Sequence, residues 1–421
     1  MSKHGDDRLL SVAVVGGGAA GFFGAIAAAT ANPQAQVTLY EASPRPLAKV
    51  RISGGGRCNV THHCFEPAQL VQSYPRGGKA LRGAFSRFQP KDTVAWFAKR
   101  GVKLKTEADG RMFPVTDDSA TIVDCLYQAA ERAGVRIKVS SPIVSAEKLG
   151  DQFRLQLKSQ NFVKCDRLLL TTGSSPAGHR IAQSLGHQLE RPVPSLFTFN
   201  IADKQLHQLS GVAVNPATVR LQVEGASKKD LKALTQTGPL LVTHWGLSGP
   251  AVLKLSAWAA RLLFEQKYRA ALVVNWLPDL NQDQVRTELQ QVKAENGKKT
   301  ISTYSPYSAI SKRLWQYLLG RNKIEPTLTW ANLSKKQLNQ LVTELTQGSY
   351  AITGKGVFKD EFVTCGGVRL NEINFKTMES RQCKGLYLSG EILDIDGITG
   401  GFNFQSAWTT SWLSGQSISQ P

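Results

Sequence analysis

The sequence predicts an α/β fold in which both ends of the chain build one nucleotide-binding domain around a parallel sheet. Three observations predict it. A glycine-rich turn follows the first predicted strand, strands and helices alternate from there to about residue 196, and the same alternation returns from residue 350 onward. The intervening residues follow other patterns, so we expect two inserted domains. The predicted division is a nucleotide domain of residues 1–195 and 350–421, a β domain of 196–279 and a helical domain of 280–349.

The first strand and helix carry a dinucleotide-binding fingerprint. A β-branched run over 10–15 precedes Gly16, Gly18 and Gly21, and an alanine-rich helix is expected over 19–31. The first glycine permits the tight turn, the second lets the backbone approach a pyrophosphate, and the third lets the helix lie against the sheet. N–H groups at the helix start, including those of Ala19 and Ala20, then face the phosphates.

An acidic residue stands where the fingerprint requires one. A second strand over 36–40 ends at Glu41, twenty residues after Gly21. A carboxylate at this distance accepts hydrogen bonds from the ribose hydroxyls of an adenosine. We therefore expect the N-terminal segment to bind an ADP moiety.

The rest of the nucleotide domain continues the alternation. Helices are expected near 90–100 and 118–133, and strands near 135–146 and 152–158. An apolar run over 166–172 then ends in Thr172 and Gly173. A strand that brings Thr-Gly to the carboxyl edge of a parallel sheet suits a second contact with the same dinucleotide.

The inserted segments differ from this pattern. Short β-rich runs over 198–201, 217–223, 240–243 and 271–276, without regular helices between them, predict a β-barrel-like domain. Amphipathic spacing then predicts helices over 282–295, 308–320 and 335–347, with Asn332 and Ser334 as candidate caps. Strand patterns return at 362–365 and 385–388, and a final helix is expected over 403–415.

A second glycine loop offers groups that suit an anion or a flavin ring. It runs through Ser53, Gly54, Gly55, Gly56, Arg57, Cys58 and Asn59. The glycines expose backbone N–H groups, and Arg57 stands beside a thiol. Two interpretations of Cys58 stay open: a proton donor tuned by Arg57, or a buried inert side chain.

The C-terminal segment over 386–405 combines a strand, carboxylates and a glycine pair that opens a helix. In two-ended flavoprotein domains such a segment places an acidic side chain on the ribityl hydroxyls and helix N–H groups at the pyrimidine edge of the flavin. The candidate residues are Gly390, Glu391, Asp394, Asp396, Gly400, Gly401, Phe402 and Asn403.

The composition indicates which kinds of partner and which cell compartment to expect. Lys and Arg outnumber Asp and Glu by 51 to 32, a formal charge of +19 that favours polyanions such as RNA. The six cysteines show no disulfide framework or metal-ligand spacing, so we expect no metal and a cytoplasmic protein with reduced thiols. Glycines interrupt the apolar stretch over 12–31, so we expect no membrane segment. The sequence gives no sign of the oligomeric state.

Several blocks resemble the YhiN/BaiN-like family of FAD-dependent flavoproteins. They are residues 14–21, Lys49 with 52–61, 243–253, 364–368 and 386–405. Two positions depart from the family pattern: His62 replaces an Asn, and Ser174 follows Gly173 in place of a second glycine. The resemblance implies an FAD domain interrupted by a β domain and a helical domain. It also implies that the fingerprint and Glu41 hold the ADP half of FAD. Residues 53–59 and 390–404 would then surround the ribityl chain and the isoalloxazine ring.

The resemblance implies reduction of activated carbon–carbon double bonds. One branch is associated with dihydrouridine in 23S ribosomal RNA and another with steroid-like enones. No second fingerprint is visible, so we expect NAD(P)H to visit the flavin transiently. An RNA-binding uridine reductase explains the positive charge. The basic segment around 298–336 would then contact the RNA phosphates. Two interpretations of Trp315, Tyr317 and Trp330 stay open: they stack on bases, or they pack in the core. The alternatives are a reductase of small enones or quinones and a non-catalytic flavoprotein.

Overall fold

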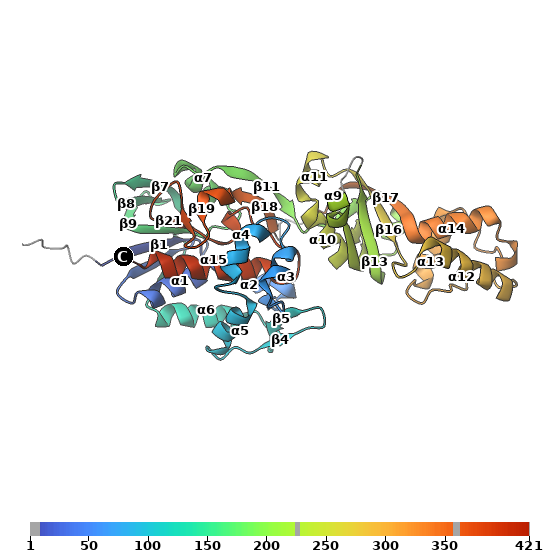
Figure 1. Cartoon of the computed structure of the whole chain (residues 1–421), viewed down its shortest axis with the longest axis horizontal. Helices are drawn as coiled ribbons and strands as arrows, with labels where there is room; N and C mark the ends of the chain where they lie inside the picture. The colour runs from blue at the N-terminus through green and yellow to red at the C-terminus, as the bar shows by residue number, and fades with distance from the viewer. Residues whose placement is uncertain (1–8, 224–227, 357–362, 421) are drawn as a thin grey trace, which may run out of the picture. The chain divides into compact units, whose positions relative to one another are not determined.

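The computed structural model describes residues 9–223, 228–356 and 363–420, and the chain divides into two compact units. Unit 1 comprises residues 1–193 and 363–421, and unit 2 comprises residues 194–362. Figure 1 shows both units coloured along the chain. Unit 1 is therefore built from two separate stretches of sequence, with unit 2 inserted between them.

A seven-stranded sheet forms the centre of unit 1. Its strand order is β19-β20-β21-β10-β1-β2-β6, and the five strands from β21 to β6 run parallel. Apolar residues fill the central strands of the sheet because helices and loops cover both of its faces. The strands are β1 (Ser11–Val15), β2 (Gln36–Tyr40), β6 (Arg136–Lys138), β10 (Arg167–Leu170), β19 (Ile373–Asn374), β20 (Glu379–Ser380) and β21 (Leu386–Leu388).

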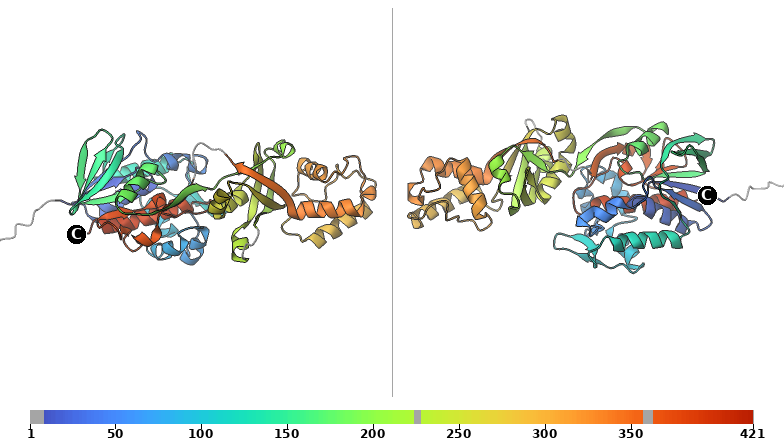
Figure 2. Two further views of the ribbon diagram at one scale, coloured as in Figure 1. Left: turned by 90° about the horizontal axis from the view of Figure 1, so that it is seen from above. Right: turned by 180° about the vertical axis from the view of Figure 1, so that it is seen from behind.

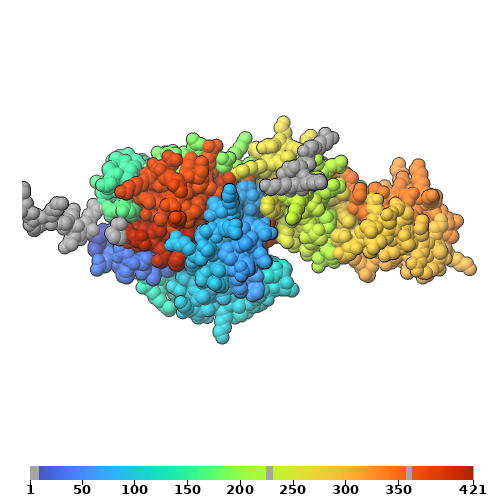
Figure 3. Space-filling view, viewed as in Figure 1, coloured from blue at the N-terminus to red at the C-terminus, as the bar shows by residue number. Residues whose placement is uncertain are grey.

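Helices from the two ends of the chain pack against each other in unit 1. They are α1 (Ala19–Ala31) and α15 (Phe402–Ile418), which lie side by side in Figures 1 and 2. Glycines allow the close approach: a Cβ built on Gly415 would lie 2.5 Å from the Cβ of Ala27. In the space-filling view, the blue and red ends of the colour range share one face of the unit (Figure 3). The expected two-ended domain is confirmed.

Shorter elements complete unit 1. Two antiparallel three-stranded sheets and the pair β11-β18 flank the central sheet. Their strands are β3 (Thr61–His62), β4 (Leu104–Thr106), β5 (Arg111–Pro114), β7 (Ile143–Leu149), β8 (Gln152–Leu157), β9 (Phe162–Cys165), β11 (Leu189–Ser195) and β18 (Val363–Val368). The remaining helices are α2 (Ala48–Ile52), α3 (Pro67–Leu70), α4 (Gly78–Phe85), α5 (Pro90–Ala98), α6 (Ala120–Arg132) and α7 (Pro176–Ser184).

A closed six-stranded barrel forms part of unit 2, which confirms the expected β-barrel-like insertion. Its strand order is β12-β15-β14-β13-β16-β17. The strands are β12 (Phe199–Ile201), β13 (Ala213–Gln222), β14 (Thr235–Thr243), β15 (Gly246–Ser248), β16 (Ala270–Asn275) and β17 (Gly348–Lys355).

Regular helices do occur between the barrel strands, contrary to the sequence expectation. They are α8 (Lys204–His207), α9 (Lys228–Ala233), α10 (Pro250–Trp258) and α11 (Ala260–Glu265). Helix α10 buries Ala251, Val252 and Leu255 against the barrel and has little polar surface. A helix that is apolar over most of its circumference gives a weak amphipathic signal, so its sequence is easily taken for strand.

The helical segment of unit 2 lies in the connection between β16 and β17. It contains α12 (Gln282–Glu295), α13 (Lys312–Arg321) and α14 (Lys335–Gln347), and its apolar side chains join the barrel residues in one core cluster. Figure 2 shows α14 leading directly into β17. Since β17 pairs with β12 and β16, residues 348–355 belong to the barrel, and the chain returns to unit 1 at Val363 rather than at residue 350.

The three aromatic residues considered for base stacking are core residues. Trp315 and Trp330 are fully buried and stack on each other with ring centroids 6.2 Å apart. Tyr317 is buried as well, and its hydroxyl donates to Asp203 over 2.8 Å. All three therefore stabilise unit 2, and base stacking by these side chains is ruled out because their faces are covered by protein.

Candidate functional site

Three parallel strands of unit 1 end at the same edge of the sheet. Val15 of β1 lies in register with Leu170 of β10, which in turn lies in register with Leu388 of β21. The turns after these strands contain the fingerprint glycines, Thr172 with Gly173, and Gly390 with Glu391. Because carboxyl ends of parallel strands meet at one edge, three separate parts of the sequence converge on one candidate site.

Gly16 and Gly21 take the structural roles expected of them. Gly16 has φ +110°, and a Cβ there would lie 2.6 Å from the Thr171 carbonyl oxygen. A Cβ on Gly21 would lie 1.8 Å from the Gly16 carbonyl oxygen, so only glycine lets α1 pack here. Gly18 differs, because no atom lies within 4 Å of a Cβ built on it. The space beside Gly18 is what a pyrophosphate would require.

The start of α1 leaves its N–H groups available. Its cap residue is Gly18, which has no side chain to accept from the first turn. Glu41 lies beside this turn and accepts from the Gly17 N–H over 2.6 Å and from the Ser43 N–H over 2.7 Å. Each carboxylate oxygen can accept more than one hydrogen bond, so Glu41 keeps acceptor capacity for hydroxyl groups.

The C-terminal turn closes against the start of α1. A Cβ built on Gly390 would lie 2.8 Å from the Cβ of Ala20, which shows how closely the two turns approach. The next residue, Glu391, accepts from Lys49 Nζ over 2.6 Å and from the Thr364 N–H over 2.9 Å. Lys49 and Glu391, 342 positions apart in the chain, are thus held together as an ion pair.

Two buried polar atoms near this turn have no hydrogen-bond partner among the described residues. They are Oγ1 of Thr172 and Nε2 of His179, which lies on α7. Burial lowers the pKa of His179, while the neighbouring Glu391 carboxylate raises it. Buried polar groups are normally hydrogen-bonded, so unsatisfied ones beside a cradle suit a polar ligand. The sequence analysis missed His179, since only the fold brings α7 to this turn.

The second glycine loop has an open surface. Gly54, Gly55 and Gly56 all have positive φ, and nothing lies within 4 Å of a Cβ built on Gly55 or Gly56. Asn59 secures the loop: oriented so that its amide is satisfied, it donates to the Thr61 carbonyl and accepts from the Gly401 N–H over 3.0 Å. The loop is thereby joined to the start of α15, as a common site requires.

Arg57 forms ion pairs with two nearby carboxylates, those of Glu107 and Asp117. Its Nη1 lies 2.6 Å from Glu107 Oε1 and 3.4 Å from Asp117 Oδ1, and its guanidinium stacks over the Phe113 ring. Hydrogen bonding to Glu107 raises the pKa of Arg57. The charge of Arg57 is therefore engaged by these two carboxylates.

Cys58 is fully buried, and burial raises the pKa of its thiol to about 12. A nearby cation would lower that pKa, yet only a hydrogen bond with Ser53 acts in this direction. The expectation of a thiol tuned by Arg57 does not agree with this geometry. The second interpretation, a buried inert cysteine, fits it.

Two of the three carboxylate residues after Gly390, Asp394 and Asp396, are buried. Asp396 is fully buried and pairs with Arg76, whose Nε donates to Asp396 Oδ1 over 2.6 Å. Asp394 is also buried, and its N–H donates to the Val368 carbonyl over 3.0 Å. These two residues hold the segment in place, which leaves Glu391 as the most accessible carboxylate of the three.

The helix that follows begins with available N–H groups. Its cap residue, Gly401, has φ +89° and no side chain to cap the first turn of α15. Phe402 stacks on His62 with centroids 4.5 Å apart, and His62 Nδ1 lies 3.0 Å from the Gly400 carbonyl oxygen. Asn403 bonds both the N–H and the carbonyl of Gly397. Its amide thus fixes the preceding loop.

Taken together, the site offers two uncapped helix N-termini, glycine surfaces with room for a ligand, and an acidic residue beside the first turn. These features fit FAD: α1 and Glu41 suit the ADP half, and residues 53–59 with the start of α15 suit the flavin half. Across the described ranges, no group of three or more His, Cys, Asp or Glu could hold a metal ion. No helix of the described part is long and apolar enough to cross a membrane.

Comparisons with known proteins agree with this geometry. The family model described as "HI0933-like protein Rossmann domain" matches residues 10–417. The chain is 31% identical to the ribosomal RNA dihydrouridine synthase of Escherichia coli K12, over 96% of this chain and 97% of that protein. It is 28% identical to the 3-dehydro-bile acid delta(4,6)-reductase of Clostridium scindens, over 97% and 99%.

Among solved structures, the open conformation of a flavocytochrome c3 fumarate reductase has a similar fold. It matches with a TM-score of 0.50 and 15% identity, covering 99% of this chain and 79% of that one. This likeness concerns the fold alone. The two relatives act on different substrates by name, an RNA and a bile acid, so the comparisons do not select the substrate.

Proposed function

Since the chain belongs to the HI0933-like family of Rossmann-domain proteins, which are FAD-dependent oxidoreductases, we propose that it reduces uridine to dihydrouridine in 23S ribosomal RNA. The formal charge of +19 supports an RNA substrate, because a polyanion gains affinity from many basic side chains. The 31% identity to a ribosomal RNA dihydrouridine synthase supports the same substrate. A small bile acid gives no reason for such a charge.

The residues of unit 1 would hold the cofactor in two halves. The N–H groups at the start of α1 bind the pyrophosphate, with Gly18 leaving room for it, and Glu41 orients the adenosine ribose. Glu391, positioned by Lys49 and Thr364, accepts from ribityl hydroxyls. When bound, the flavin supplies a hydride which, with a proton, saturates the 5,6 double bond of uridine.

Other residues keep these groups in position. The Arg76–Asp396 ion pair and the bonds between Asn403 and Gly397 hold the loop before α15, so its N-terminus stays directed at one place. We infer that NAD(P)H is a transient donor, because the chain has one glycine fingerprint between a strand and a helix. We expect a proton donor other than Cys58, whose thiol is buried.

The function is tested by measuring dihydrouridine in ribosomal RNA from the source organism, with and without the gene. We expect mass spectrometry of nuclease digests to show loss of one dihydrouridine without the gene. The intact gene should restore it, and a Gly18→Ala gene should not. An unchanged dihydrouridine level contradicts the proposal.

A reductase of small enones or quinones is the second candidate, favoured by the bile acid reductase relative. Purified protein with pre-reduced flavin separates the two. Rapid flavin reoxidation by enones, with no reoxidation by a ribosomal RNA transcript, favours the second candidate. The reverse result favours RNA.

A further inference from the structure

We propose that the pocket between α13 and α14 in unit 2 is a docking site for single-stranded RNA, binding phosphates through lysines and base edges through amides. This inference rests on the proposed function and adds the surface that binds the substrate. The pocket has a volume of about 770 Å³. It is lined by Arg321, Asn322, Lys335, Lys336, Asn339, Gln340, Thr343, Glu344, Gln347, Gly348 and Ser349.

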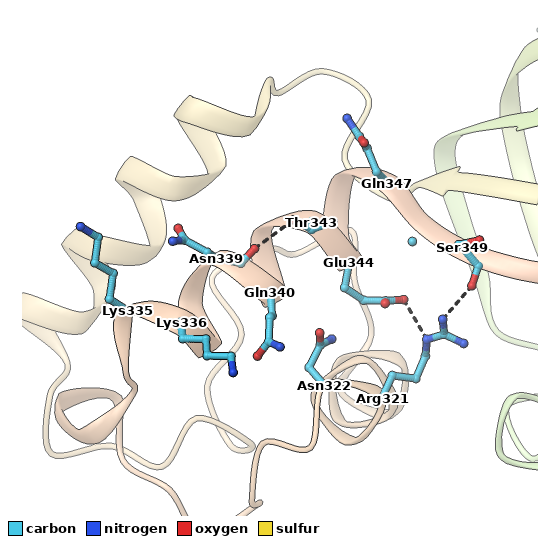
Figure 4. A pocket seen from close by; sticks show the side chains of 11 residues that line it. Arg321, Asn322, Lys335, Lys336, Asn339, Gln340, Thr343, Glu344, Gln347 and Ser349 are labelled. Atoms are coloured by element: carbon cyan, nitrogen blue, oxygen red, sulfur yellow. Dashed lines mark hydrogen bonds and ion pairs between the residues drawn. The ribbon is translucent and has the colours of Figure 1, made fainter. Parts of the chain in front are cut away.

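The lysines of the pocket have free charges. Lys335 and Lys336 are exposed, and the ammonium group of neither has a hydrogen bond or ion pair with any residue in the described ranges. Arg321 and Glu344 instead neutralise each other, with Nε 2.9 Å from Oε1 (Figure 4). The acidic residue in the lining is therefore already paired, and the pocket presents net positive charge to an incoming polyanion.

The position of the lysines in α14 is unfavourable for the helix itself. Ser334 caps α14, so Lys335 and Lys336 occupy its first two positions, where the helix dipole disfavours cations. Acidic residues at these positions would stabilise the helix. A phosphate bound beside either lysine would make this arrangement favourable, because that ammonium group and the helix N-terminus both attract an anion.

Amide side chains supply the second part of the recognition. Asn322, Asn339, Gln340 and Gln347 line the pocket, and Figure 4 shows Gln340 and Asn322 extending into it from α14 and from the end of α13. Asn322 Nδ2 donates to the Leu318 carbonyl over 2.8 Å, and Asn339 Oδ1 accepts from Arg286 Nε over 3.3 Å. The amides of Gln340 and Gln347 are therefore the ones best placed to meet a ligand. An amide both donates and accepts, so it can pair with base edges or with ribose hydroxyls. The segment's three aromatics, Trp315, Tyr317 and Trp330, are buried, so base stacking on them is not available here.

The test compares two pairs of charge reversals in full-length, FAD-loaded protein. K335E/K336E reverses the pocket lysines. K298E/K299E is the matched control, since Lys298 and Lys299 are also adjacent, exposed and in the helical segment but do not line the pocket. The probe is a fluorescein-labelled, uridine-containing single-stranded RNA, and its binding is measured by anisotropy over a salt series.

We expect K335E/K336E to weaken RNA binding about tenfold or more at moderate salt, and to lower the slope of log affinity against log salt by about 1.4, the value for two phosphate contacts on a single strand. K298E/K299E should bind nearly as wild type. FAD content should be unchanged in both variants. The circular dichroism spectrum and the thermal midpoint should also match wild type, which excludes misfolding of the helical segment. Equal losses in both variants, or no loss in K335E/K336E, would overturn the proposal.

Two further outcomes separate the pocket from the proposed function. If wild-type protein makes dihydrouridine and K335E/K336E makes it equally well at low RNA concentration, the pocket proposal fails while the function stands. If the pocket variant alone loses RNA binding but wild type makes no dihydrouridine, the function fails and RNA docking stands. Polyglutamate tests for a general polyanion site: displacement of RNA by an equal charge concentration of polyglutamate contradicts RNA docking.

Discussion

The glycines of the fingerprint differ in the space beside their Cα atoms. This difference shows which of them the fold requires and which of them a ligand would require. Gly16 and Gly21 have no room for a Cβ because protein atoms occupy that space, whereas Gly18 has room and an ordinary φ of −84°. A methyl group on Gly18 therefore meets nothing in the protein. It would meet only what binds beside α1.

Gly18→Ala should fold normally and bind FAD about 5- to 150-fold more weakly. The added methyl should cost about 1–3 kcal/mol of binding free energy, the usual range for overpacking a close contact. The absorbance of the purified protein near the flavin maximum and its thermal midpoint measure the two effects. Gly83→Ala is the matched control, because Gly83 on α4 is exposed and equally open, so it should keep FAD. A Gly18→Ala protein with full FAD content would contradict the site.

Cys58→Ala should leave turnover unchanged and reduce stability. The buried thiol, with its pKa raised to about 12, contributes packing, and its loss should lower the free energy of unfolding by about 1–2 kcal/mol. Urea denaturation and single-turnover flavin reoxidation measure the two quantities. A turnover at least tenfold slower, with FAD retained, would instead assign Cys58 a role in the reaction.

At the scale of elements, a buried polar cluster fastens the strand pair β19–β20 to the start of β11. His187 Nδ1 lies 2.7 Å from Glu372 Oε2, and its Nε2 lies 2.8 Å from Ser380 Oγ. The order Ser-His-Glu is that of a hydrolytic triad, but all three side chains are buried and Ser380 Oγ also accepts from two backbone N–H groups. The cluster is therefore structural.

This cluster makes stability depend on pH. Burial lowers the pKa of His187 below its usual value of about 6.5, although Glu372 raises it. The unfolded chain then binds a proton more readily than the folded one, so the contribution is complete above pH 6.5 and is lost as the pH falls below it. Wild type should lose more stability between pH 7.5 and 5.5 than His187→Gln, measured by urea denaturation. Parallel pH dependences would contradict this role.

At the scale of the whole molecule, unit 2 is inserted between two neighbouring strands of unit 1. Strand β11 leads out of unit 1, β18 leads back into it, and the two strands pair. The two ends at which unit 2 joins unit 1 are therefore already close together. All the residues proposed to hold the cofactor lie outside the insertion. Unit 2 contributes a separate hydrophobic core and the pocket between α13 and α14.

Replacing residues 194–362 by a short Gly-Ser linker should leave a folded unit 1 that still binds FAD, because the β11–β18 pairing fixes the linker ends. The same protein should lose RNA binding. Flavin absorbance, circular dichroism and RNA anisotropy test the three expectations. An excised protein that binds RNA as tightly as the full chain would assign RNA recognition to unit 1.

The sequence by itself determined the local elements of the site. Strand 36–40 and the helices over 19–31, 282–295 and 335–347 occur with the predicted bounds, because fingerprint spacing, caps and amphipathic periodicity are local properties. The geometry of the first glycine turn also follows from spacing alone. Helix α15 extends to Ile418 beyond its predicted end, because it is buried on most sides and lacks a clear polar face.

Only the tertiary structure decided how distant residues meet and which are accessible. The approach of Gly390 to Ala20, the Lys49–Glu391 pair and the place of His179 depend on strand order, which local sequence does not encode. Burial decided that Cys58, Trp315 and Trp330 are core residues. The sequence pattern of β17 did not predict that this strand pairs within the barrel rather than in unit 1. The alternation of residues along a strand specifies which side chains share a face, but it does not specify the neighbouring strand.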